Sequence, residues 1–177
     1  MRLFVAICFP EEIKAYLSEC SQRLRFLAAS GRFTQWENFH LTLAFLGEIP
    51  PDRLASLKTV LSSIVMPRFS LLITGLGKFQ QPHGALYWAG VSPSLELSLL
   101  FQQLNGRLRT LGFSVGKNDH CPHITLGRAI RLKKDARLYP LSVVPPKRFE
   151  VRKISLMRSD RIEGLLTYTE IDRKFLK

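Results

Sequence analysis

The two histidines of this sequence that are best suited to catalysis occur in the same short pattern. The segments "HLTL" (His40 to Leu43) and "HITL" (His123 to Leu126) each place a threonine two residues after a histidine and a leucine directly after that threonine. In a β-strand, side chains two residues apart point to the same face of the sheet. Each copy therefore predicts an imidazole beside a hydroxyl on one face, with apolar neighbours anchoring the other.

A pair of histidines suits the cleavage of a phosphodiester. A neutral imidazole accepts a proton from an attacking water or hydroxyl, and a protonated one gives a proton to the leaving oxygen. Histidine has a reference pKa near ~6.5 and can hold either state around neutral pH. The hydroxyls of Thr42 and Thr125 can donate to the non-bridging oxygens, where negative charge builds up in the transition state. This scheme requires no metal ion and no other cofactor.

Other interpretations of these histidines have less support. A single His-x-Thr is usually a strand histidine satisfied by a neighbour, but two copies with the same leucine weaken that interpretation. A zinc site is the next alternative, because Cys121 lies on the His123 face by parity, yet the sequence has no CxxC or HExxH. His83 and His120 are expected at the surface or in loops. No phosphate-binding loop and no GxSxG is present.

The predicted elements that position the two motifs alternate in an α+β order. We expect helices that start near residues 10, 50 and 92, and a long basic loop over 129–146. We expect strands at 3–9, 39–46, 69–76, 85–91, 123–126, 149–156 and 166–171. This order predicts mostly antiparallel sheets, with two similar lobes facing each other and one His-x-Thr-Leu strand in each.

Composition limits the partners and the compartment. The chain has 177 residues, 46% of them hydrophobic, which suits a single domain over 1–177. Its net charge is +12, with +3 in residues 1–88 and +9 in residues 89–177, which favours an anionic partner. Three cysteines at irregular spacing suggest reduced thiols in the cytoplasm. No apolar segment is long enough to cross a bilayer, so no membrane is expected.

Five segments together make the chain similar to a known family. They are "RLFVAICFP", "ENFHLTLAFLGEI", "LYWAGV", "CPHITLGR" and "ISLMRSDRIEGLLTYTEI". The chain resembles the two-histidine (2H) phosphoesterase superfamily and, within it, the RNA 2′,3′-cyclic phosphodiesterases, also called 2′–5′ RNA ligases. The resemblance implies a bilobal α+β fold with pseudo-two-fold symmetry, in which two antiparallel sheets line a central basic groove and helices lie outside.

The resemblance also implies the reaction and the roles. RNA with 2′,3′-cyclic phosphate ends, tRNA fragments being one candidate source, would be hydrolysed to 2′-phosphomonoesters, with reversible 2′–5′ ligation as a further activity. His40 would donate a proton to the departing 3′ oxygen, and His123 would accept one from water. Thr42 and Thr125 would hold the phosphate. A monomer without an obligate protein partner is expected.

Two matters stay open at this point. Arg128 matches the arginine that closes the family's second motif, but simple alternation places it on the opposite face from His123, so its participation requires a twist near Gly127. The alternative functions are an RNA-binding module without turnover, or a 2H phosphodiesterase acting on 2′–5′-linked oligonucleotides or ADP-ribose cyclic phosphate.

Overall fold

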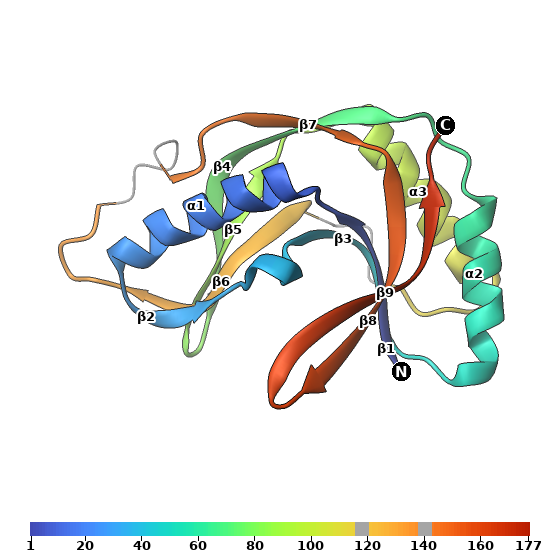
Figure 1. Cartoon of the computed structure of the whole chain (residues 1–177), viewed down its shortest axis with the longest axis horizontal. Coiled ribbons are helices and arrows are strands. Elements are labelled where there is room, and N and C mark those ends of the chain that lie inside the picture. Colours follow the sequence, from blue (N-terminus) through green and yellow to red (C-terminus); the bar gives the residue numbers. More distant parts are fainter. Residues whose placement is uncertain (116–120, 138–142) are drawn as a thin grey trace.

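The chain forms two antiparallel sheets, one of four strands and one of five (Figure 1). The computed structural model describes residues 1–115, 121–137 and 143–177. His120, expected in a loop, lies outside these residues. The predicted α+β class with antiparallel sheets is confirmed.

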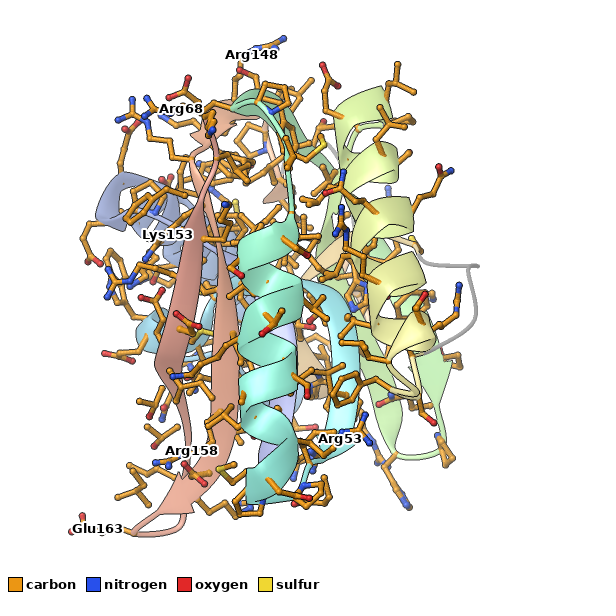
Figure 2. All side chains as sticks on the ribbon, turned by 90° about the vertical axis from the view of Figure 1, so that its right-hand side faces the viewer. Arg53, Arg68, Arg148, Lys153, Arg158 and Glu163 are labelled. Atoms are coloured by element: carbon orange, nitrogen blue, oxygen red, sulfur yellow. The ribbon has the colours of Figure 1, made fainter. Side chains whose placement is uncertain are left out.

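The four-stranded sheet carries the first motif. Its strands lie in the order β3-β1-β8-β9. Their bounds are His40–Glu48 for β3, Arg2–Cys8 for β1, Lys153–Ile162 for β8 and Leu165–Phe175 for β9. β8 and β9 form a long hairpin that projects from the body of the molecule (Figures 1 and 2). Its two-residue turn, Glu163 and Gly164, has positive φ at both positions, as a tight hairpin turn of this length requires.

The five-stranded sheet carries the second motif. Its strands lie in the order β2-β6-β5-β4-β7. Their bounds are Ala28–Phe33 for β2, His123–Leu132 for β6, Gly84–Val91 for β5, Phe69–Gln81 for β4 and Lys147–Val151 for β7. β6 is thus an inner strand, paired on both sides, which fixes the position of the motif that it carries.

The helices cover the outer faces, and the two lobes are interleaved. α1 (Glu11–Leu27) follows β1 of the four-stranded sheet but packs against β6 of the five-stranded one. α2 (Leu54–Ser63) and α3 (Leu95–Thr110) pack against each other and against strands of the four-stranded sheet (Figure 2). One cluster of buried apolar side chains includes members of both sheets and of these three helices. The lobes therefore share a core.

Local sequence explains where α1 and α3 begin. Pro10 precedes the first turn of α1, and Glu11 and Glu12 lie at the positive end of its dipole. The Ser94 hydroxyl caps α3 by accepting from the Leu97 amide at 3.2 Å. No helix in the described part of the chain is both long and apolar enough to span a membrane.

Several expected elements differ from the observed ones, β4 and β9 among them, which extend to Gln81 and Phe175. The sequence does not predict β2, because its exposed residues show no apolar alternation; pairing with β6 makes it a strand. The same pairing extends β6 into the predicted loop as far as Leu132. The single strand expected over 149–156 is two strands in different sheets, and the chain passes from one sheet to the other at Arg152.

Candidate functional site

His40 opens β3, and its contacts fix the orientation of its ring. Nδ1 lies 2.8 Å from the carbonyl oxygen of Asn38, and Nε2 lies 3.1 Å from the Thr42 hydroxyl. The rings of Phe4 and Tyr168 pack against the imidazole, with centroids at 4.9 and 5.1 Å. The imidazole and the hydroxyl of the first motif therefore share a face, as the spacing predicts.

His123 opens β6 in the same way. Its Nδ1 lies 2.8 Å from the carbonyl oxygen of Cys121, again two residues earlier. Two aromatic rings flank it, Phe79 at 5.3 Å and Trp88 at 6.1 Å between centroids. The Trp88 ring has room only because its partner on β4 is Gly77, where a Cβ would lie 2.0 Å from the ring.

The two carbonyl contacts assign the same tautomer to both histidines. A carbonyl oxygen only accepts, so Nδ1 carries a hydrogen and donates it in each ring. The nitrogen that can exchange a proton with a substrate is therefore Nε2 of His40 and Nε2 of His123. A matched pair of this kind supports one acid and one base acting on the same molecule.

The environment of His40 holds its imidazole neutral. Burial lowers the pKa of His40 to about 4, and the positive charges of Arg128 and His123 act in the same direction. The Asn38 carbonyl opposes this effect by accepting from Nδ1. His40 of the first motif and Thr125 and Arg128 of β6 line one cavity, which brings parts of both motifs together.

A β-bulge directly after the threonine reorients the end of the second motif. Trp88 pairs with Thr125 and Tyr87 pairs with Gly127, which leaves Leu126 as the extra residue. Leu126 and Gly127 are both buried, so the alternation shifts by one and Arg128 is exposed. Simple alternation does not hold here, and the bulge lies at the place near Gly127 where the participation of Arg128 requires a twist. Arg128 lines the same cavity as Thr125.

The first motif contains the same bulge. Ala6 pairs with Thr42 and Val5 pairs with Ala44, so Leu43 is the extra residue. Phe45 consequently occupies on β3 the position that Arg128 occupies on β6. Phe45 is 49% exposed, and the Arg2 guanidinium lies over its ring at 5.1 Å from the centroid.

A cavity of about 320 Å³ brings together three of the five predicted site residues, His40, Thr125 and Arg128. Thr42 instead lines a separate cavity of about 470 Å³ beside the start of α3. His123 is in neither set of lining residues. The volume near His40 lies at the lower end of the ~300–1,000 Å³ usual for small-molecule sites.

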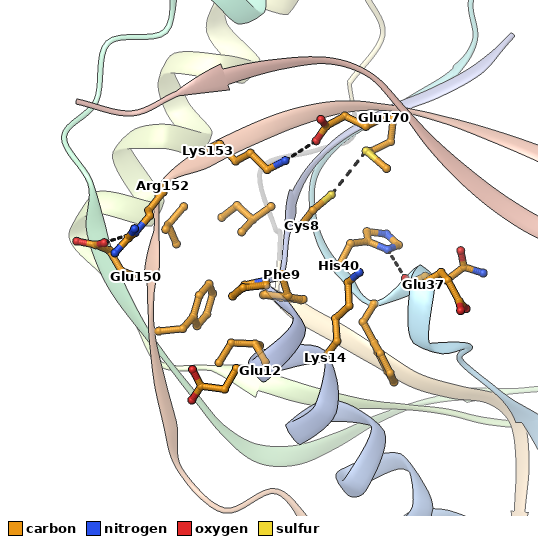
Figure 3. A pocket seen from close by; sticks show the side chains of 18 of the residues that line it. Cys8, Phe9, Glu12, Lys14, Glu37, His40, Glu150, Arg152, Lys153 and Glu170 are labelled. Carbon is orange, nitrogen blue, oxygen red and sulfur yellow. Dashed lines mark hydrogen bonds and ion pairs between the residues drawn. The ribbon is translucent and has the colours of Figure 1, made fainter.

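A larger cavity of about 810 Å³ is also lined by His40 (Figure 3). Its charges are balanced, since four basic and four acidic residues line it. Several of them are paired, as Lys153 with Glu170 at 2.8 Å and Arg152 with Glu150 at 2.5 Å (Figure 3). The electrostatic attraction for an anion is therefore weaker in this cavity than in the smaller one.

Three residues of the site escape sequence reasoning. Asn38 is buried, offers its carbonyl to His40 and donates from Nδ2 to the Leu166 carbonyl at 2.8 Å, which ties the β8–β9 hairpin to the first motif. Arg32 and Arg161 line the smaller cavity from β2 and from the hairpin. Only the position of Asn38, two residues before His40, was a usable signal.

The depressed pKa of His40 predicts a pH-dependent stability. The pKa of His40 is about 6.5 in the unfolded chain and about 4 in the folded protein. Between these two pH values the unfolded chain binds more protons than the folded protein, so the free energy of unfolding falls as the pH falls. We expect the unfolding free energy of the protein relative to a His40→Gln variant to decrease by about 3 kcal/mol from pH 7 to pH 4. Urea unfolding of both proteins at several pH values measures this difference. A constant difference would show that His40 titrates normally.

Comparisons with known proteins place these features in a family. A family model described as LigT like Phosphoesterase matches residues 7–87. A Thermotoga maritima protein named RNA 2′,3′-cyclic phosphodiesterase is 34% identical over 131 residues, which cover 72% of this chain and 70% of the relative. An Archaeoglobus fulgidus protein of the same name is 35% identical over 137 residues, covering 74% of each. The chain belongs to the LigT-like phosphoesterase family.

Solved LigT-like structures share the whole fold. The structure of TT0787 of Thermus thermophilus has a TM-score of 0.80 at 25% identity, over 99% of this chain and 97% of its own. Escherichia coli LigT complexed with 3′-AMP has a TM-score of 0.80 at 27% identity, with the same coverage. The predicted resemblance is confirmed, and membership of the LigT-like family makes the chain a phosphoesterase. Among the residues described, no three His, Cys, Asp or Glu side chains cluster as metal ligands would.

Proposed function

We propose that the chain, acting as one domain, hydrolyses the 2′,3′-cyclic phosphate at the end of an RNA to a 2′-phosphomonoester without a metal ion. The observation that carries this proposal is the matched pair of histidines, each with Nδ1 on a carbonyl oxygen and Nε2 as the reacting nitrogen. The names of the Thermotoga and Archaeoglobus relatives, and the 3′-AMP complex of E. coli LigT, support this substrate class.

The proposed reaction balances with two proton transfers. A water oxygen forms a bond to phosphorus while Nε2 of His123 takes its proton. The bond from phosphorus to the 3′ oxygen breaks, and Nε2 of His40 gives a proton to that oxygen. Thr42, Thr125 and Arg128 hold the non-bridging oxygens, where charge increases in the transition state. Each turnover leaves His40 neutral and His123 protonated, and exchange with solvent resets them.

His40 must be protonated to act in this way, and the bound substrate supplies the reason. In the free site, burial lowers the pKa of His40, and the charge of Arg128 acts in the same direction. A phosphodiester beside the ring carries a negative charge that offsets the charge of Arg128 and favours the imidazolium. Substrate binding and protonation of His40 are therefore coupled, and binding should take up a proton.

A defined RNA oligonucleotide with a 2′,3′-cyclic phosphate end tests the proposal. We expect complete conversion to a product with a 2′-phosphomonoester, identified against synthetic 2′- and 3′-phosphate standards, at a rate unchanged by EDTA. A bell-shaped dependence of kcat/KM on pH is expected from the acid and the base. Binding without product after prolonged incubation would instead favour an RNA-binding module, and a 3′-phosphate would contradict the assigned leaving oxygen.

The same assay separates the other substrate classes. A panel that includes 2′–5′-linked oligonucleotides and ADP-ribose cyclic phosphate, compared by kcat/KM, ranks them against RNA ends. Adding an RNA with a 5′-hydroxyl tests the reverse joining to a 2′–5′ linkage. The expected cytoplasmic location, the monomeric state and tRNA fragments as a source of substrate remain predictions.

A further inference from the structure

The cavity beside His40 carries more positive charge than the reacting phosphate can balance. Arg32, Arg128 and Arg161 line it, and no Asp or Glu is among the described residues that do. A cyclic phosphodiester has one negative charge, which one guanidinium satisfies. The larger cavity nearby, by contrast, has as many acidic as basic residues. The smaller cavity is therefore built for a second anionic group.

Two of these arginines face each other across neighbouring strands. Arg32 on β2 pairs directly with Arg128 on β6 in the antiparallel register. Like charges at directly opposed positions destabilise a sheet. Both arginines also line the same cavity, so an anion there would lie within reach of each and relieve their repulsion. An uncharged nucleobase cannot do this.

The third guanidinium comes from the opposite lobe. Arg161 lies near the tip of the β8–β9 hairpin and pairs with Leu166, whose carbonyl accepts from Asn38 Nδ2 at 2.8 Å. The segment that holds Arg161 is therefore tied to the residue that orients His40. A group bound between Arg32 and Arg161 would bridge the two lobes at a fixed distance from the reacting phosphate.

We propose that Arg32 and Arg161 bind the phosphate on the 5′ oxygen of the terminal nucleotide. This inference rests on the proposed function. In an RNA with a cyclic phosphate end, the 2′ and 3′ oxygens are both closed, so the chain continues only through the 5′ phosphate. That group is one sugar unit from the cyclic phosphate, and guanidinium forks suit it. The enzyme would thereby select RNA ends over free cyclic mononucleotides that carry a 5′-hydroxyl.

Three substrates with the same base test the assignment. They are a nucleoside 2′,3′-cyclic phosphate with a 5′-hydroxyl, the same compound with a 5′-phosphate, and a dinucleotide with the cyclic phosphate end. We expect kcat/KM of the protein to be about tenfold higher for the second and third than for the first, since hydrogen bonds to charged groups are strong enough for this. The preference should shrink at high salt.

Variants locate the source of the preference. In Arg32→Gln and in Arg161→Gln the ratio of kcat/KM between 5′-phosphorylated and 5′-hydroxyl substrates should fall towards one. Arg131→Gln is the matched control, because Arg131 is an exposed arginine of β6 that does not line the cavity. The control should keep the full ratio.

The possible outcomes separate this inference from the proposed function. Turnover of all three substrates without a 5′-phosphate preference overturns the inference and leaves the proposed function intact. A preference that survives in both variants, or that follows the base and not the phosphate, also overturns it. No turnover of any substrate contradicts the proposed function itself.

Discussion

Replacing either His40 or His123 with alanine should lower kcat by a factor of about 10²–10⁴, which is the range for loss of a general acid or base. Each ring presents Nε2 as the nitrogen that exchanges a proton, because Nδ1 donates to a backbone carbonyl. Single-turnover rates on an RNA with a cyclic phosphate end measure the loss directly.

Controls must show that the loss is chemical. His83→Ala removes an exposed histidine at the β4–β5 turn and should leave the rate unchanged. His40→Gln keeps much of the volume that Phe4 and Tyr168 pack against, so it guards against a folding defect. Circular dichroism and thermal unfolding verify the fold of each variant. Full activity in a folded His40 or His123 variant would contradict the two-histidine mechanism.

A substrate with a better leaving group distinguishes the acid from the base. A 3′-deoxynucleoside 2′-phosphate esterified with 4-nitrophenol releases nitrophenolate, which departs without a proton, and it has no 3′-hydroxyl that could displace the nitrophenolate in place of water. If His40 is the proton donor, its alanine variant should recover most of the wild-type rate on this ester, whereas the His123 variant should not. Equal losses in both variants would show that the assigned roles are wrong, although both histidines would remain essential.

Arg128 provides the second large effect. We expect Arg128→Gln to lower kcat/KM by about 100-fold, as the loss of one donor at a developing negative charge does in other enzymes. Arg128→Lys should recover only part of the loss, because lysine keeps the charge but not the bidentate fork. Arg131→Gln, on the same strand but outside the cavity, should change kcat/KM little.

The same substitution has an independent spectroscopic readout. The positive charge of Arg128 contributes to lowering the pKa of His40. Its removal should therefore raise that pKa towards the ordinary histidine value. NMR titration of the His40 ring in both proteins measures the change. An unaltered pKa together with an unaltered rate would place the Arg128 guanidinium outside the site.

Strongly patterned segments of the fold could be predicted from the sequence. The apolar run of β1 and the stripe of α1 indicated the correct elements, and the start of each was within one residue. β2 could not be predicted, since only its partner β6 makes that exposed segment a strand. The passage of the chain from one sheet to the other at Arg152 could not be predicted either, because a single apolar run supplies strands to both sheets there.

The candidate site, like the fold, could be predicted from the sequence only in part. Residue spacing alone placed Thr42 beside His40. It failed at Arg128, because a bulge at Leu126 adds one residue to the alternation and leaves no mark in the residue types. Arg32 and Arg161 were beyond reach for another reason. They are distant in the sequence from both motifs, and only tertiary folding brings them to one cavity.

The matched bulges in β3 and β6 make the two ends of the site chemically different. They carry the chain of each lobe to equivalent positions, but one ends in the aromatic ring of Phe45 and the other in the guanidinium of Arg128. A site with true two-fold symmetry would accept a diester in either of two opposite orientations, and each histidine would serve as acid half of the time. Because an aromatic ring stands at one end and a cavity-lining guanidinium at the other, the two ends of the site are not equivalent, and under the proposed function we expect the acid and the base to keep their places between turnovers.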